Sequence, residues 1–154
     1  GIDVARAAGQ GHVAGCTGAT SERTVQALHG LPDHAMLDMG DFVGGMAKYL
    51  KTHPVERLTV GGGIGKITKL AQGATDLHSS RSRVDFARLA TRSGYAMVDK
   101  AETALHAYDL AGEGLAEIVA QDAKRMMDGL LGGTGMIIDI VVVDRAGRIL
   151  SRAG

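Results

Sequence analysis

The pattern that most constrains this fold occurs three times in the first half of the chain. Short apolar segments cover residues 12–16, 35–37 and 58–60, and each is followed by a glycine-containing turn and then apolar residues at helical spacing. Three consecutive strand, turn and helix units imply βαβ connections, which are almost always right-handed and make the strands parallel. The first half therefore predicts a parallel sheet with helices against its faces.

The second half predicts further helices and a final pair of strands. Helical spacing covers residues 84–92, 95–108 and 115–130, and a nearly continuous apolar, β-branched run covers 136–143. Asp144 to Gly147 has turn chemistry and leads into residues 148–150, which predicts a hairpin. At 154 residues the chain is long enough for one domain. We expect a single three-layer α/β domain with a mostly parallel sheet, to which the hairpin can add an antiparallel edge.

Parallel connections bring the three glycine-containing turns to the same edge of the sheet. Open α/β sheets bind ligands at the carboxyl ends of their strands. Asp41, at the second turn, is also a candidate cap for the helix that follows it. The candidate binding residues on these turns are Thr17, Gly18, Asp41, Gly61, Gly62, Gly63 and Gly65.

The glycines of the third turn come close to several nucleotide-binding motifs without completing them. A phosphate loop needs a glycine where this chain has Val60 and a Ser or Thr where it has Ile67. A dinucleotide fingerprint needs a glycine where this chain has Lys66. The spacing Gly61-x-Gly63-x-Gly65 resembles the first motif of methyltransferases that use S-adenosylmethionine. The alternative is a glycine turn that serves only tight strand-to-helix packing.

Charge is balanced globally and concentrated locally. Lys plus Arg and Asp plus Glu each number 17, so the net charge is zero and nothing predicts nucleic acid or an anionic membrane as a partner. Residues 61–92, by contrast, hold six basic side chains against two acidic ones, a local charge of +4. Lys66 and Lys69 oppose the positive end of their own helix dipole, which favours an anionic ligand there. The alternative is two solvated lysines.

Other polar residues give weaker predictions. Asp76, His78 and Ser79 cluster in one loop, where His78 could act as an acid or base, although local hydrogen bonding is the commoner fate of such residues. The histidines lack metal-ligand spacing, so we predict no protein-bound metal. The single Cys16 is more simply a core residue than a nucleophile. A lone cysteine cannot form a disulfide within the chain, and the sequence shows no signal peptide and no apolar span of roughly 18 to 20 residues. These features favour the cytoplasm.

The sequence resembles the cobalt-precorrin-5B C1-methyltransferase family of cobalamin biosynthesis, over that family's C-terminal half. The resemblance is carried by residues 39–44, 62–73, 77–79 and 84–85, in this order and spacing. Many members have histidine and threonine where this chain has Gly63 and Leu77. The family has a preceding domain of comparable size, so we expect residues 1–154 to be the C-terminal domain of a longer, two-domain enzyme.

The resemblance implies transfer of a methyl group from S-adenosylmethionine to C-1 of an anionic tetrapyrrole, with cobalt carried by the substrate. It implies catalytic roles for His78 and Asp85, and ligand-binding roles for Lys66, Lys69, Asp76, Ser79 and Arg81. A noncatalytic tetrapyrrole-binding module, whose partner domain performs the chemistry, is the alternative. A nucleotide-binding domain is a third interpretation, which the incomplete motifs disfavour.

Overall fold

A computed structural model describes all residues, 1–154, and contains one five-stranded sheet in the order β2-β1-β3-β4-β5. The strands are β1 (His12–Cys16), β2 (Met36–Leu37), β3 (Arg57–Gly63), β4 (Ile137–Val143) and β5 (Ile149–Ala153). The first four are parallel, and β5 pairs antiparallel with β4. The predicted α/β class, the mostly parallel sheet and the antiparallel C-terminal hairpin are confirmed.

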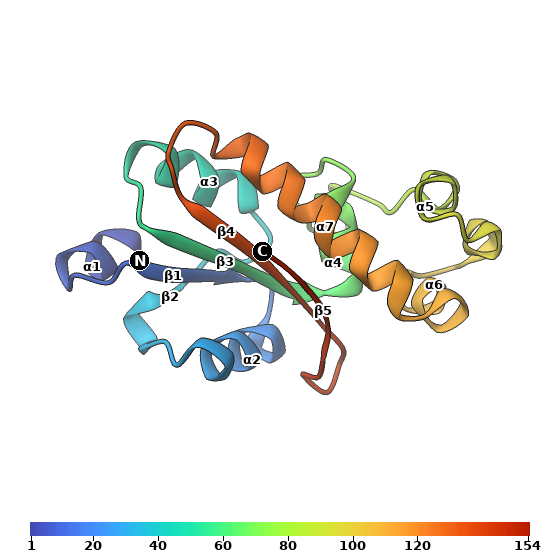
Figure 1. Cartoon of the computed structure of the whole chain (residues 1–154), viewed down its shortest axis with the longest axis horizontal. Helices are drawn as coiled ribbons and strands as arrows, with labels where there is room; N and C mark the ends of the chain where they lie inside the picture. The colour runs from blue at the N-terminus through green and yellow to red at the C-terminus, as the bar shows by residue number, and fades with distance from the viewer.

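Helices cover both faces of this sheet (Figure 1). The helices are α1 (Ile2–Ala7), α2 (Ala19–His29), α3 (Val43–Thr52), α4 (Ile64–Ala71), α5 (Phe86–Ser93), α6 (Ala104–Ala111) and α7 (Glu113–Leu130). Figure 1 shows α2 on one side of the sheet and α3, α4 and α7 on the other. None of the helices combines the length and the apolar character needed to cross a membrane.

The period-2 alternation of β4 divides its side chains between two cores. Ile138, Ile140 and Val142 belong to a core of 30 buried residues that includes α3, α4 and α7. Val141 and Val143 point the other way, into a core of seven buried residues beneath α2. Because both faces are covered, β4 is apolar almost throughout, as expected for a central parallel strand.

The third turn differs from the prediction. Gly61, Gly62 and Gly63 are the last residues of β3, and α4 begins directly at Ile64. None of these glycines has a positive φ, so a left-handed turn is not the reason for them.

Close packing explains two of the glycines. A Cβ atom on Gly61 would lie 2.7 Å from a methyl group of Val25 in α2 and 3.0 Å from Cys16 Sγ. A Cβ atom on Gly62 would lie 2.8 Å from Thr17 Oγ1. At these two positions the structure thus supports the packing alternative over direct contact with a ligand.

Two further expectations about helices are wrong. Asp41 does not cap α3, because Phe42 is its N-cap residue and no side chain accepts a hydrogen bond there. Residues 95–108 are not one helix, but a 3₁₀ segment (Ala96–Lys100) followed by α6. The hydroxyl of Thr103 accepts a hydrogen bond from the His106 N–H at 3.0 Å, which starts a new helix at that point.

Candidate functional site

Two helix N-termini meet beside an open cavity at the carboxyl edge of the sheet. Gly18 is the N-cap residue of α2 and Gly63 that of α4, and no side chain caps either helix. The first N–H groups of a helix have no partner within it, and the helix dipole favours negative charge there. Both N-termini line one cavity of about 440 Å³. This arrangement can accept an anionic group of a small ligand.

The cavity wall also includes residues that follow β4 and precede α6. Its lining is Thr17–Ser21, Gly63–Gly65, Thr103–Leu105 and Val143–Arg145. Asp144 accepts hydrogen bonds from the N–H groups of Arg148 and Ala146, both at 2.9 Å. The Arg148 N–H in particular holds the pKa of the Asp144 carboxyl below its usual range, so this side chain is committed to the hairpin turn. Arg145 is exposed at the cavity and forms no ion pair within the chain.

Sequence reasoning missed this part of the wall. Asp144 and Arg145 could have been found, since β4 is parallel to β3 and its carboxyl end must reach the same edge. Thr103 carried the signal of an N-cap residue within a segment that we predicted to be a continuous helix.

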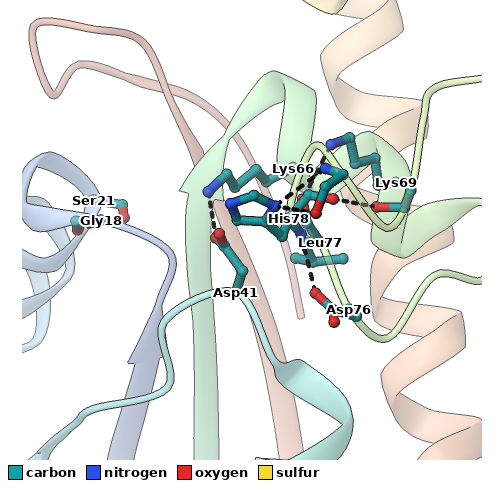
Figure 2. A network of polar contacts seen from close by, with 10 residues as sticks. Gly18, Ser21, Asp41, Lys66, Lys69, Asp76, Leu77 and His78 are labelled. Carbon is teal, nitrogen blue, oxygen red and sulfur yellow. Dashed lines mark hydrogen bonds and ion pairs between the residues drawn. The ribbon is translucent and has the colours of Figure 1, made fainter.

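Lys66 and Lys69 have partners within the protein (Figure 2). The Lys66 ammonium forms a salt bridge with the Asp41 carboxylate, which lies in the loop before α3. Lys69 Nζ donates a hydrogen bond to the Leu77 carbonyl oxygen at 3.0 Å. The anion that pairs with Lys66 is thus the Asp41 carboxylate of the protein itself.

The loop that carries His78 is held against the start of α3. The Leu77 N–H donates to the Asp41 carbonyl at 2.8 Å, and Asp76 forms an isolated antiparallel bridge with Phe42. Asp76 also accepts a hydrogen bond from the His78 N–H at 3.2 Å, while His78 Nδ1 lies 2.8 Å from Ser80 Oγ. His78 is exposed, and its imidazole is engaged in hydrogen bonds with the neighbouring Ser80.

Asp85 caps α5. Its carboxylate accepts a hydrogen bond from the Arg88 N–H at 3.0 Å, and its backbone exchanges two hydrogen bonds with the Gln72 side chain. Asp85 is absent from the cavity lining, and a catalytic role for it stays a prediction.

Some basic residues of the region 61–92 have hydrogen-bond partners within the protein, and others have none. Arg92 forms two hydrogen bonds with the Asp122 carboxylate, both at 2.9 Å, and Arg88 donates to the Gln72 carbonyl oxygen. Arg81 and Arg83 are exposed, and their side chains form no hydrogen bond or ion pair with the rest of the chain. These two cations are the ones left to meet an anionic ligand.

The predicted site residues thus fall into separate groups. Thr17, Gly18, Gly63 and Gly65 line the cavity. Asp41, Lys66, Lys69, Asp76 and His78 form a hydrogen-bonded group around the start of α3 and the loop after α4, apart from Gly18 in Figure 2. Gly61 and Gly62 are packed within the sheet, and Ser79, Arg81 and Asp85 lie outside both groups. The chain is thus an α/β domain with a cavity at the carboxyl edge of a mostly parallel sheet.

Comparison with curated proteins finds methyltransferases that are similar to this chain. The chain is 52% identical to the cobalt-precorrin-5B C(1)-methyltransferase of Brucella anthropi over an alignment that covers 99% of this chain and 44% of the relative. Proteins of the same name from Brucella ovis and Brucella melitensis are 50% identical with the same coverage. No protein-family profile and no solved structure matches the chain.

Along nearly its whole length the chain is similar to the C-terminal part of cobalt-precorrin-5B C(1)-methyltransferases. It spans less than half the length of the curated relatives that it matches.

Proposed function

We propose that this chain is the ligand-binding C-terminal part of an enzyme that transfers a methyl group from S-adenosylmethionine to C-1 of cobalt-precorrin-5B in cobalamin biosynthesis. The observation that carries the proposal is the 52% identity to a protein of that name along 99% of the chain. The other part of the enzyme, in this proposal, comes from a domain that precedes residue 1.

The cavity at the sheet edge suits the methyl donor. S-adenosylmethionine carries a carboxylate, which the open N-termini of α2 and α4 would stabilise through their N–H groups and dipoles. A cavity of about 440 Å³ lies within the usual range for small-molecule sites of roughly 300–1,000 Å³. Gly65 supports this assignment, because nothing lies closer to its Cβ position than the Ala104 methyl group at 3.9 Å.

The proposed reaction forms one carbon–carbon bond and breaks one carbon–sulfur bond. The C-1 carbon attacks the methyl group in line with the sulfonium sulfur, and the donor leaves as a neutral thioether. Such a transfer depends chiefly on holding the two reactants in line and keeping water away. Residues 17–21 and 63–65 would fix the donor side of this arrangement.

The acceptor would lie outside this cavity, over the loop after α4. A tetrapyrrole with several carboxylates needs cations, and Arg81 and Arg83 are exposed there without partners in the chain. Charge-assisted hydrogen bonds of this kind contribute roughly 1.5 to 3 kcal/mol each. His78 is exposed on the same loop and is the candidate for moving any proton.

A second candidate function is that of a noncatalytic module that holds the tetrapyrrole while a partner domain binds the methyl donor. The observation in its favour is that His78, Arg81 and Arg83 lie outside the cavity. A tetrapyrrole held by these three residues would therefore not need the cavity.

Separate calorimetric titrations distinguish the two functions. We expect the purified chain to bind S-adenosylmethionine at the sheet edge and a cobalt corrinoid through the loop, with Arg81→Gln and Arg83→Gln weakening only the second. Binding of the corrinoid alone would support the module. A folded chain that binds neither compound would contradict both functions.

A further inference from the structure

A group of possible metal ligands lies at the opposite end of the sheet from the cavity. His12 is the first residue of β1, His29 is the last residue of α2, and Asp139 is the third residue of β4. One ligand atom from each of these residues lies within 4.8 Å of the other two. The sequence gives no sign of this group, because its members are 17 and 110 residues apart and only the fold brings them together.

Two polar atoms in this group are buried without a hydrogen-bond partner. They are His29 Nε2 and Asp139 Oδ2, which face each other at 3.4 Å. The His29 side chain is 10% exposed and that of Asp139 is 3% exposed. Buried polar atoms nearly always have a partner, so this pair calls for an explanation.

Contacts around the group hold the carboxylate in place. Asp139 Oδ1 accepts hydrogen bonds from Thr59 Oγ1 at 2.8 Å and from Arg57 Nε at 3.0 Å. His12 Nε2 lies 2.8 Å from the same Thr59 hydroxyl, and its ring packs edge-on against that of His29 with centroids 4.8 Å apart. These contacts hold Oδ1 and leave Oδ2 facing the imidazoles. Hydrogen bonds to metal-binding carboxylates orient them in the same way.

We propose that His12, His29 and Asp139 bind one divalent transition-metal ion, with Zn²⁺ as the best fit and water as the fourth ligand. Zinc bonds to nitrogen and oxygen are about 2.0–2.2 Å long, so two ligands of a tetrahedral ion lie roughly 3.3–3.6 Å apart. The 3.4 Å between His29 Nε2 and Asp139 Oδ2 matches this separation, and His12, whose ligand atom lies within 4.8 Å of both, would move closer to complete the site.

The surroundings favour a transition metal over Mg²⁺ or Ca²⁺. Those hard cations need several oxygen ligands, whereas this group offers two nitrogens and one free carboxylate oxygen beside the Arg57 guanidinium. An ion here would tie β1, α2 and β4 together at the opposite end of the sheet from the cavity, so its binding would be independent of the proposed function.

Metal titrations of the chelator-treated full chain test the site. We expect calorimetry to give one Zn²⁺ per chain, and Co²⁺ to give the visible absorption of a tetrahedral nitrogen-ligated ion. His12→Gln and His29→Gln should each weaken Zn²⁺ binding at least tenfold. The matched control is His34→Gln, because His34 is exposed and belongs to no such group.

Thermal unfolding separates a lost ligand from a lost fold. Saturating Zn²⁺ should raise the melting temperature of the wild type and of His34→Gln, but not of His12→Gln or His29→Gln, whose metal-free melting curves show whether they are folded. The proposal is overturned if the folded wild type binds no Zn²⁺, or if its Zn²⁺ affinity survives both substitutions. If the two glutamine variants do not fold, unchanged Co²⁺ absorption in the folded Asp139→Asn variant overturns it equally.

Discussion

Lys66, in the first turn of α4, forms a salt bridge with Asp41, which lies 25 residues earlier in the loop before α3. This pair connects the second and third βαβ units at the carboxyl edge of the sheet. It also offsets the unfavourable position of a cation near the N-terminus of a helix. The lysine that suggested an external anion is thus neutralised by an internal one.

Removing this salt bridge should cost little stability. The two side chains are 37% and 20% exposed, so solvent screens the pair and we expect Lys66→Met to lower the free energy of unfolding by about 0.5–1 kcal/mol. Urea denaturation at low and high salt measures it, with Lys51→Met, an exposed lysine of α3, as the control. An effect that does not shrink with salt would show that Lys66 acts through packing instead.

Gly61 and Gly65 should respond oppositely to alanine. Gly61→Ala would place a methyl group 2.7 Å from Val25 and 3.0 Å from Cys16 Sγ, and we expect a loss of about 1–3 kcal/mol in the free energy of unfolding. Gly65 lies in α4 with no atom closer than 3.9 Å to its Cβ position, so Gly65→Ala should be neutral or stabilise by up to about 1 kcal/mol. Chemical denaturation of both variants checks this, and equal losses would refute the packing explanation.

Asp85 should be replaceable by asparagine but not by alanine. Because its side chain caps α5, Asp85→Ala should destabilise the protein by about 1 kcal/mol, whereas Asp85→Asn keeps an acceptor for the Arg88 N–H. Hydrogen exchange of the α5 amides reports the fraying directly. If Asp85→Asn frays α5 as much as Asp85→Ala, charge rather than capping holds the helix start.

Cys16 should be unreactive in the native protein. Burial raises the pKa of its thiol to about 12, so that on the order of one molecule in ten thousand carries a thiolate at pH 8. We expect no reaction with a thiol-specific disulfide reagent at pH 8 until denaturant is added. Fast labelling of the folded protein would contradict the burial.

The raised pKa of Cys16 also predicts how the free energy of unfolding changes at alkaline pH. A thiol whose folded-state pKa lies above the unfolded value of 9.0 stabilises the fold below pH 9, and this contribution is lost as the pH rises from 9 towards 12. Cys16→Ala should therefore flatten this part of the pH dependence measured by denaturation.

Periodicity predicted the architecture well, because β4 and the three strand–helix units bury apolar side chains at regular spacing. It failed where a single polar residue decides between two local structures, as Thr103 does in starting α6. It also did not reveal why glycines end β3. Val25 and Thr17, which come from elsewhere in the chain, lie too close to Gly61 and Gly62 for a side chain there. The partner of Lys66 and the grouping of His12, His29 and Asp139 depend on tertiary geometry, which no spacing in the sequence encodes.

The most direct test of the central claim is calorimetric binding of S-adenosylmethionine to the wild-type chain and to Gly65→Val. Gly129→Val is the control, since Gly129 lies in α7 with open space around its Cβ position. We predict that the wild type and Gly129→Val bind the donor, and that Gly65→Val, with a side chain added to the cavity wall, is folded but does not. Undiminished binding to folded Gly65→Val, or no binding to the folded wild type, would contradict a donor site between the N-termini of α2 and α4.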